Sequence, residues 1–373
     1  MNRTWHYVSL VCLLVVFLLA GCAQTSAPAT PAASSTGSGK AAPAPAAESK
    51  PASSGGQSTT ISIGSGTTGG GQYAVATGIA KVVSDHTSIK ASAKPFAGPA
   101  AWMPMIASGE LGLGVMSAAD ALWARTGVNG YDNPTKELTM VMYGNLLPVA
   151  PLAVRNDSDI KSTKDLKGKR VASEYGGNAS MREIVTAALE SVGLTWNDVK
   201  PVPVPDMASG ITALQEGRVD AACGGTPTHA TAMQVDSAVG LRLLNFGDLP
   251  PEQANNPPKE LVDILQKHQP GATIYLQKKE GFLKSDATSF HYPEVLVASG
   301  KVSADLIYQI TKTVYEYDKE LQPVHAWTQD WKQETMFNPN PSIPYHEGAV
   351  RFWKEIGKWT PEAEANQQKL LGQ

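Results

Sequence analysis

A glycine-rich loop contains the residues whose types and spacing best suit chemistry. The sequence GSGTTGGG at positions 64–71 lies between a strand predicted at 61–63 and a helix predicted at 72–86. The first amides of a helix have no intrahelical acceptor, and glycines leave loop amides unshielded, so both can point at one bound anion. Hydroxyl groups in the loop add hydrogen-bond donors. The residues predicted to bind an anion here are Ser65, Thr67, Thr68, Gly69, Gly70 and Gly71.

Two other interpretations of this loop are a purely structural turn and a dinucleotide-binding site. Gly64, Gly66 and Gly69 match the GxGxxG pattern, which requires an acidic residue at the end of the next strand, about 20 residues further on. Asp85 instead precedes that strand, which ends in the sequence KPF at 94–96. The dinucleotide interpretation is therefore disfavoured, and the structural turn stays open.

No catalytic or metal-binding pattern accompanies the loop. The seven histidines form neither HExxH nor HxxxH, so the sequence predicts no zinc site, no cofactor and no enzyme activity. Cys223 and His229 are close in sequence, but a lone cysteine at a strand end usually packs in a core, so a nucleophile is disfavoured. With 31 basic and 34 acidic residues, the net charge of -3 gives no basic footprint for nucleic acid.

The first 58 residues have the pattern of an exported, lipid-anchored protein. The apolar run at 8–20 is shorter than the ~20 residues that span a bilayer, and the sequence LAGC at 19–22 is typical of lipoprotein signals. We predict a signal peptide over residues 1–21, lipidation of Cys22 and an extracytoplasmic location on the outer face of the cytoplasmic membrane. An uncleaved anchor helix is the alternative. Residues 22–58, rich in Ala, Pro, Ser and Gly, indicate a flexible tether.

The rest of the chain alternates short apolar runs with amphipathic helices, which is typical of an α/β fold around mainly parallel sheets. Roughly 315 residues exceed what one hydrophobic core usually organises, so two lobes are expected. Residues 106–113 and 214–221 share one plan of helix end, glycine, charged residue and strand, which indicates similar lobes unless the likeness is chance. The other predicted elements are strands at 89–96, 111–116, 167–175, 201–205 and 219–223, and helices at 102–107, 180–192, 208–216, 306–321 and 349–356.

Several motifs, taken in order, resemble a known family. They are ISIGSGTTGGGQY at 61–73, ASGE at 107–110, DLKGKRV at 165–171, ALQEGRVDA at 213–221 and YHEGAVRFWKE at 345–355. Together they resemble the TAXI class of TRAP-transporter solute receptors over about residues 59–360, although DLKGKRV alone also occurs in receptors of ABC transporters. The resemblance implies a two-lobed periplasmic-binding-protein type II fold. Each lobe would be a mainly parallel sheet flanked by helices, with a ligand cleft between the lobes.

The resemblance also implies a function. The lobes would close like a hinge on a small organic acid, and the closed form would deliver this carboxylate ligand to the membrane permease subunits of a TRAP transporter. Crossovers near residues 149 and 293 are expected by analogy, so lobe 1 would comprise 59–149 and 294–373, and lobe 2 would comprise 150–293. A ligand-sensing lipoprotein, or a receptor of another transporter class, is the alternative.

Carried over to this sequence, the family pattern extends the candidate site beyond the glycine loop. Tyr73 would stack on the ligand or hydrogen-bond to it, and the strand-to-helix turn at 175–180 would offer helix-start amides. The strand that follows would end at the cleft with the sequence GGT at 224–226. The ligand-binding residues implied in this way are Tyr73, Gly98, Trp102, Tyr175, Asn178, Ser180, Gly225 and Thr226.

Two departures from the family pattern concern the ligand itself. Many relatives carry Gly-Ser and a polar residue where this chain has Gly98-Pro99, followed by Trp102, and Thr-Tyr-Tyr where it has GQY at 71–73. These changes remove small polar side chains and add an aromatic plane, which implies an acid that is bulkier or less polar than glutamate, unless Trp102 packs on a helix face. Glu174 could hold an ammonium group or face solvent, and both alternatives stay open.

Overall fold

The computed structural model describes residues 59–372, which belong to one compact unit, Gly56–Gln373. The predicted signal peptide (1–21), the lipidation site Cys22 and the tether (22–58) lie outside the described residues. No helix within the described part is both long and apolar enough to cross a bilayer.

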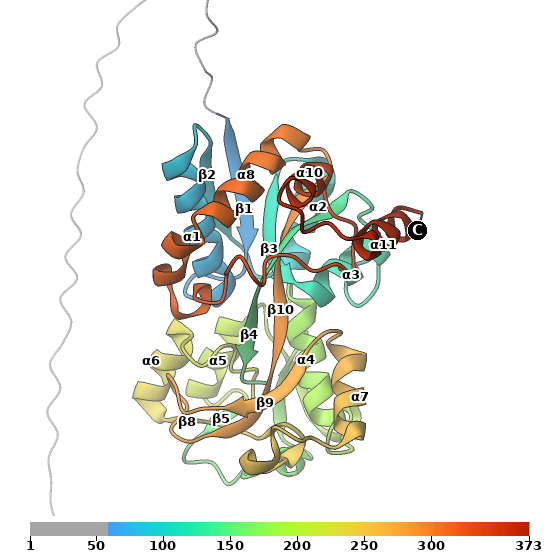
Figure 1. Ribbon diagram of the computed structural model, residues 1–373. Helices are drawn as coiled ribbons and strands as arrows, with labels where there is room; N and C mark the ends of the chain where they lie inside the picture. Colours follow the sequence, from blue (N-terminus) through green and yellow to red (C-terminus); the bar gives the residue numbers. More distant parts are fainter. Residues whose placement is uncertain (1–58, 373) are drawn as a thin grey trace, which may run out of the picture. The chain divides into compact units, whose positions relative to one another are not determined.

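The main sheet has the strand order β2-β1-β3-β10-β4, and β9 pairs with one end of β10 (Figure 1). The strands β1, β2 and β3 are parallel, whereas β10 runs antiparallel to β3, β4 and β9. The sheet is therefore mixed: a strand that returns from the far part of the chain is inserted between β3 and β4. The strands are β1 (Thr60–Ser65), β2 (Lys90–Pro95), β3 (Leu113–Ser117), β4 (Leu138–Val149), β9 (Thr273–Gln277) and β10 (Ala287–Ser299).

Helices pack around this sheet because their apolar residues recur at helical spacing and their ends carry capping residues. The Ser117 side chain accepts from the backbone N–H of Asp120 and so starts α3, and Gly109, with φ of 85°, ends α2 in the left-handed conformation. The helices here are α1 (Gly71–His86), α2 (Pro99–Ser108), α3 (Ala118–Thr126), α8 (Ala304–Glu316), α9 (Asp318–Leu321), α10 (Glu347–Glu355) and α11 (Pro361–Leu371), with the short helices η5 (Gln322–Val324) and η6 (Ala326–Thr328).

The middle of the chain forms smaller sheets covered by four helices. The strands β6 and β7 pair in parallel and β5 and β8 antiparallel, while Ala221 and Ala222 bridge the two pairs. The strand predicted at 219–223 is thus reduced to two bridging residues, and the next backbone N–H, that of Cys223, bonds to the Tyr175 hydroxyl instead of a neighbouring strand. The elements are β5 (Ala153–Arg155), β6 (Arg170–Ser173), β7 (Lys200–Pro203), β8 (Leu241–Leu243), α4 (Ala179–Glu190), α5 (Met207–Gln215), α6 (Ala230–Val239) and α7 (Lys259–His268), with the short helices η1 (Thr163–Leu166), η2 (Trp196–Asp198), η3 (Phe246–Asp248) and η4 (Pro251–Gln253).

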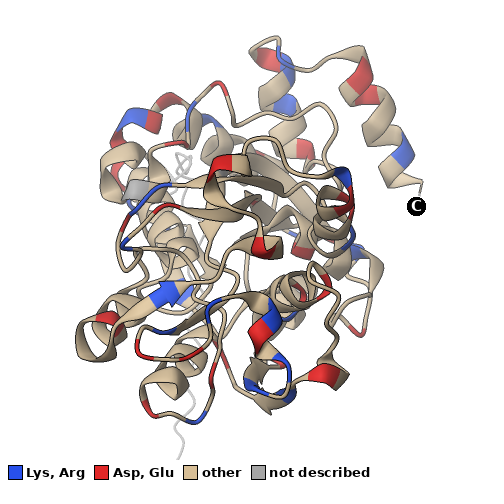
Figure 2. Ribbon diagram, turned by 90° about the horizontal axis from the view of Figure 1, so that it is seen from below, with Lys and Arg blue, Asp and Glu red and all other residues tan. Residues whose placement is uncertain are grey.

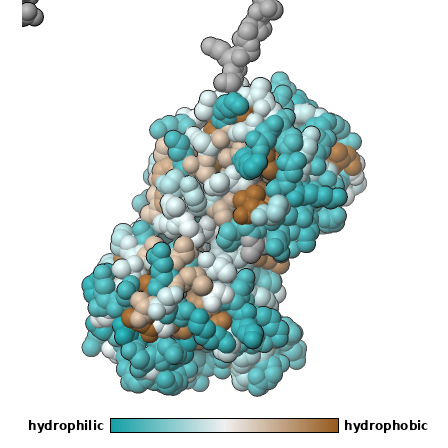
Figure 3. Space-filling model, turned by 90° about the vertical axis from the view of Figure 1, so that its left-hand side faces the viewer, coloured by the Kyte–Doolittle hydropathy of each residue, from teal (hydrophilic) through white to brown (hydrophobic). Residues whose placement is uncertain are grey.

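The buried apolar residues form two clusters, which we use to define two lobes. The first-lobe cluster comes from residues 61–142 and 295–353, and the second-lobe cluster from residues 147–292 together with Trp327. The strands β4 and β10 run from one cluster to the other, and the face drawn in Figure 3 narrows between the lobes. The crossovers predicted near residues 149 and 293 fall on these strands, and the exact lobe boundaries stay predictions.

The charged residues of the described part lie mostly around its periphery, with both signs interspersed (Figure 2). In that view no extended face carries a single sign of charge, which agrees with the small net charge of the chain. Two acidic side chains of the described part, by contrast, are almost fully buried: Asp120 in α3 and Glu294 in β10.

Candidate functional site

The loop between β1 and α1 keeps several backbone amides free. Gly70 is the N-cap of α1 and has no side chain that could cap it, while its own N–H donates to the Thr67 carbonyl at 3.1 Å. Within the described residues, the amides of Gly71, Gln72 and Tyr73 have no hydrogen-bond acceptor, as expected for a first helical turn. These amides, together with the positive end of the helix dipole, favour a negatively charged or acceptor group beside the loop.

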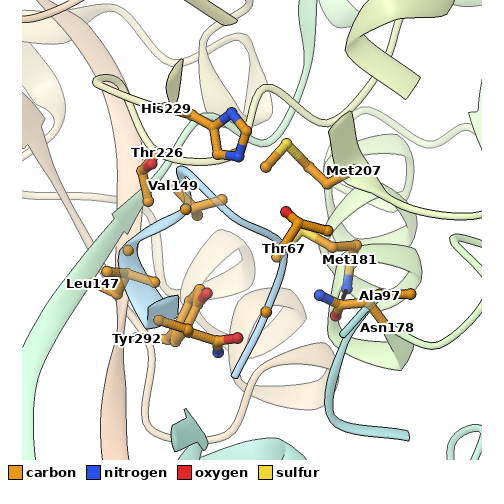
Figure 4. A pocket seen from close by; sticks show the side chains of 15 residues that line it. Thr67, Ala97, Leu147, Val149, Asn178, Met181, Met207, Thr226, His229 and Tyr292 are labelled. Atoms are coloured by element: carbon orange, nitrogen blue, oxygen red, sulfur yellow. Dashed lines mark hydrogen bonds between the residues drawn. The ribbon is translucent and has the colours of Figure 1, made fainter. Parts of the chain in front are cut away.

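This loop faces a small cavity between the two lobes, with a volume of about 40 Å³ (Figure 4). The walls come from both lobes and from the strands β4 and β10 that connect them. Most of the wall is apolar, and polar groups are few. The lining residues are Gly66, Thr67, Gly70, Gly71, Gln72, Ala97, Leu147, Val149, Asn178, Met181, Met207, Gly225, Thr226, His229 and Tyr292.

His229 presents a hydrogen-bond donor to this cavity. It is the N-cap of α6, where its Nδ1 accepts the backbone N–H of Thr231 at 3.2 Å. Burial lowers the pKa of His229 to about 4, although the charge of Asp206 acts in the opposite direction, so the ring is neutral at neutral pH. In a neutral ring whose Nδ1 accepts, the proton is on Nε2. This buried Nε2 has no partner within the described residues, so its N–H is free for a ligand.

Thr226 offers a second free group. Its side chain is 6% exposed and lines the cavity, yet its hydroxyl has no hydrogen-bond partner among the described residues. A buried hydroxyl without a partner costs about 1–3 kcal/mol, so such groups are expected to be satisfied by a ligand or water. The Thr226 hydroxyl, the His229 ring and the loop amides therefore supply several donors to one small volume.

A buried acid close to this arrangement is Glu294, two residues along β10 from the cavity-lining Tyr292. Burial raises the pKa of Glu294 to about 8, and a weak interaction with the Gln72 amide lowers it only in part. Neither carboxyl oxygen has a partner of good hydrogen-bond geometry within the described residues. Glu294 is thus protonated at neutral pH and adds no negative charge there. No lysine or arginine of the described chain lines the cavity, so the donors are neutral.

The structure brings part of the predicted site together. Around the cavity lie Thr67, Gly70, Gly71, Asn178, Gly225 and Thr226, from three segments that are far apart in sequence. Asn178 is also the N-cap of α4, since its side chain accepts from the backbone N–H of Met181 at 3.2 Å. The polar handle predicted at this position is therefore partly used by its own helix.

Other residues of the predicted glycine-loop site lie outside the cavity. The Ser65 hydroxyl is buried and donates to the Lys94 carbonyl at 3.0 Å, which joins β1 to β2. Thr68 and Gly69 are exposed at the tip of the loop. Tyr73 is half-buried in the first turn of α1 and does not line the cavity wall.

Trp102 lies in the first-lobe core rather than in the cavity. Its side chain is fully buried, and its ring packs so closely on β1 and β3 that a Cβ at Gly64 or Gly114 would come within 2.9 or 2.3 Å of it. Gly98 is buried where the lobes meet, and a Cβ there would lie 2.5 Å from the Cβ of Asn178. The aromatic plane predicted from these two positions therefore does not face the cavity, and its apolar wall comes from other residues.

The remaining predicted residues stabilise the second lobe. Tyr175 is fully buried, and its hydroxyl accepts the backbone N–H of Cys223 at 2.8 Å. The Ser180 hydroxyl accepts from the Gln269 amide at 3.1 Å. Burial raises the pKa of the Cys223 thiol to about 12, which makes it a poor nucleophile. Glu174 is exposed outside the cavity.

Sequence reasoning missed much of the cavity wall, including its strongest polar candidate. The sequence places His229 only near Cys223, because histidine is not a preferred N-cap residue and the helix that follows it, α6, was not predicted. The apolar residues of the wall carry no local signal, because buried Met, Leu and Val side chains occur throughout a core. The missed lining residues are Gly66, Gln72, Ala97, Leu147, Val149, Met181, Met207, His229 and Tyr292.

Two α/β lobes, a returning strand β10 inserted between β3 and β4, and a cavity between the lobes define the type II periplasmic-binding-protein fold predicted above. Within this class, residues 63–357 match the NMT1-like family, so the chain belongs to that family. This match supports the family but not the finer assignment to the TAXI class, which remains a proposal.

Solved structures with a similar fold include two sulfonate-binding proteins. The alkanesulfonate-binding protein SsuA from Xanthomonas axonopodis pv. citri, bound to MOPS, is 15% identical with a TM-score of 0.46, and the match covers 83% of each chain. The periplasmic aliphatic sulphonate binding protein SsuA from Escherichia coli is 16% identical with a TM-score of 0.42, again over 83% of each chain. An ancestral arginine-binding protein bound to arginine is 16% identical with a TM-score of 0.43, over 72% of this chain and 97% of that one.

Proposed function

We propose that this protein is an extracytoplasmic receptor that captures a small organic acid in the cavity between its lobes and delivers it to a membrane permease. One observation carries the proposal: several hydrogen-bond donors without partners among the described residues line one otherwise apolar cavity between the lobes. Such a site suits an oxyanion attached to an apolar body. The proposal covers binding without chemical change, because the cavity contains neither an activated nucleophile nor a charged acid–base pair.

The donors favour an anion even though no basic side chain lines the cavity. The Nε2–H of His229, the hydroxyl of Thr226 and the first amides of α1 can each donate to an oxygen atom. Hydrogen bonds to a charged acceptor contribute about 1.5–3 kcal/mol each, roughly twice the value for neutral pairs. An acid held in this way would keep its charge while its apolar part contacts Leu147 and Met207.

The size of the cavity supports hinge closure as part of the mechanism. Pockets for small molecules usually have volumes of about 300–1,000 Å³, far above the roughly 40 Å³ of this cavity. A ligand of ordinary size therefore has to separate the lobes in order to enter. We propose that β4 and β10 act as the hinge, with crossovers near residues 149 and 293, and that the permease recognises the closed form.

The proposal for the membrane partner rests on the sequence resemblance alone. We propose a TRAP-type permease, with the lipid anchor at Cys22 and the tether at 22–58 holding the receptor near it. A permease of the ABC type, or a membrane partner that senses ligand without uptake, is the alternative. Deletion of the genes for TRAP-type permease subunits in the host tests this part: uptake of the bound ligand should stop, and unchanged uptake would contradict delivery.

A thermal-shift screen tests ligand capture. The panel should hold carboxylates, sulfonates and uncharged analogues of matched shape. Ligand at about 100 times its dissociation constant adds about 2.7 kcal/mol to the free energy of unfolding and should raise Tm by several degrees. We expect shifts with one class of acid and none with its uncharged analogue. Equal shifts with the acid and the uncharged analogue would contradict the anion site.

A matched pair of threonine variants tests the position of the site. Thr226→Val removes the free hydroxyl with little change of shape, and we expect the acid identified in the screen to bind about ten- to a hundredfold more weakly. Because the unpartnered hydroxyl is lost, the ligand-free variant should be no less stable than the wild type. The control is Thr288→Val, since Thr288 is fully buried with an equally unpartnered hydroxyl outside the cavity. If both variants bind the acid equally well, the ligand does not occupy this cavity.

A further inference from the structure

The first turn of α2 finds a hydrogen-bond acceptor in the other lobe. Helix α2 belongs to the first lobe, and Ala100 is its second residue. The first amides of a helix have no acceptor within that helix. The backbone N–H of Ala100 instead donates to the Gly177 carbonyl of the second lobe at 3.0 Å. This bond therefore exists only while the two lobes are in contact at this point.

A second contact has the same design with the lobes exchanged. Ala230 is the first residue of α6, in the second lobe, and its backbone N–H donates to the Gly69 carbonyl of the first lobe at 3.4 Å. This bond is longer and therefore weaker than the one from Ala100. Each lobe thus supplies a glycine carbonyl to the start of a helix in the other lobe.

Both contacts lie directly beside residues that line the ligand cavity. Asn178 follows Gly177 in the chain, Gly70 follows Gly69, and both Asn178 and Gly70 line the cavity. In Figure 4 Asn178 lies next to Ala97, which lines the cavity just before α2. Separation of the lobes at either contact would move a lining residue away from the cavity.

The space at the first contact admits only glycine on both sides. A Cβ at Gly98, the residue before α2, would lie 2.5 Å from the Cβ of Asn178 and 2.6 Å from the Gly177 carbonyl oxygen. A Cβ at Gly177 would lie 2.8 Å from the Cβ of Ala101. Carbon atoms in contact are normally about 3.5–4.0 Å apart, so a methyl group at either position has to push the lobes apart by roughly 1 Å.

The backbone of Gly98 does not itself require glycine. Its φ of 167° and ψ of -178° are those of extended backbone, which any residue adopts. Extended backbone is also the conformation expected for the residue before a proline, here Pro99. A side chain at Gly98 is therefore opposed by the other lobe and not by its own chain.

We propose that Gly98 and Gly177 form a closure contact, in which glycine on both sides lets the lobes close over the cavity and the bond from Ala100 holds them there. Gly98 is then a positioning residue that acts through Asn178, since Gly98 itself does not line the cavity. A ligand between the lobes does not supply all of the free energy of closure, because these contacts supply part of it. The inference rests on the proposed hinge closure and concerns its regulation, but not the identity of the ligand.

Two substitutions from opposite lobes and one control test this contact. Gly98→Ala places a methyl group between the lobes from the first lobe, and Gly177→Ala places one from the second. The control is Gly112→Ala, whose Cβ would lie 2.7 Å from Cγ1 of Ile61, a member of the first-lobe cluster. All three variants add the same group at a place of close approach, but only two of these places lie between the lobes.

The readout is hydrogen–deuterium exchange at the backbone amide of Ala100 in the full-length protein without ligand. Because this amide has no acceptor in its own helix, its protection reports the contact between the lobes. We expect Gly98→Ala and Gly177→Ala each to speed the exchange about tenfold or more, since an added methyl group in a close contact is strongly unfavourable. Gly112→Ala should lower Tm but change the exchange at Ala100 less than about twofold.

Three results would overturn the inference. They are equal acceleration by all three variants, exchange as slow as in the wild type in both Gly98→Ala and Gly177→Ala, and an Ala100 amide that is already unprotected in the wild type. If one of the two interlobe variants does not fold, the other decides, because it approaches the contact from the opposite lobe. Since no ligand is used, such a failure would leave the proposed receptor function standing, and a negative ligand screen would leave this test valid.

Discussion

Replacing Glu294 by glutamine should stabilise the protein, by an amount that depends on pH. Glu294 is fully buried on β10, and neither of its carboxyl oxygens has a partner of good hydrogen-bond geometry within the described residues. Burial raises its pKa to about 8 from the usual 4.5, with a small opposing effect of Gln72. Glutamine has nearly the same shape and cannot ionise. The variant therefore removes the free-energy cost of keeping Glu294 protonated in the folded protein at a pH where the unfolded chain would release the proton, and changes little else.

The size of the effect follows from the two pKa values. Unfolding releases a proton from Glu294 between pH 4.5 and about pH 8, so the free energy of unfolding falls as pH rises through this range. Each pH unit within this range lowers the free energy of unfolding by about 1.4 kcal/mol. The total loss is about 3 kcal/mol at pH 7 and about 5 kcal/mol above pH 8. Below pH 4.5 the side chain is protonated in both states, and the contribution vanishes.

Urea unfolding of the wild type and the Glu294→Gln variant at about pH 4, 7 and 9 measures this dependence. Relative to the wild type, the free energy of unfolding of the variant should be unchanged at pH 4, about 3 kcal/mol higher at pH 7 and higher still at pH 9. Glu110→Gln is the control, because Glu110 is exposed in the turn after α2 and should change stability by less than about 0.5 kcal/mol at every pH. A difference between wild type and Glu294→Gln that does not change with pH would refute the reasoning.

Two other predictions concern stability. Burial alone would lower the pKa of His268, but its hydrogen bonds to Glu183 and Glu190, both 2.7 Å long, raise it above 6.5. The stabilisation from these bonds should be complete below pH 6.5 and lost as pH rises through the pKa of the folded state. In urea unfolding, the free energy of unfolding of the wild type should therefore fall over this range, whereas that of His268→Gln should not. Trp102→Ala should lower the free energy of unfolding by about 3–5 kcal/mol in the same assay, and a loss below about 1 kcal/mol would contradict its place in the first-lobe core.

Local patterns predicted several elements of the first lobe closely, although the helices α3 and α11 were not predicted. The helix predicted at 72–86 is α1, Gly71–His86, because its apolar residues follow helical spacing directly after a glycine turn. Gly109 ends α2 in the left-handed conformation, as its position before a strand indicated. These features depend on neighbours within a few residues, which is the range over which propensity and capping act.

The long strands that join the lobes show where such reasoning stops. No strand was predicted over most of β4 or β10, although together they form the centre of the molecule. Their pairing joins residues such as Val149 and Phe290, which are far apart in sequence, and β10 is buried on both faces for most of its length. A strand buried on both faces has no alternation of polar and apolar residues, so periodicity does not identify it or its direction.

The sequence by itself determined that this chain has a glycine-rich loop between a strand and a helix, a two-lobed α/β fold and the motifs of a solute-binding protein, while anion binding by the loop stays a prediction. Only the tertiary structure decided which side chains face the cavity. His229 does so because the start of α6 packs against the glycine loop, and Trp102 does not because Gly64 and Gly114 leave room for its ring inside the core. The physical reason is that local patterns specify each element, whereas the wall of a cavity is set by how elements distant in sequence pack against one another.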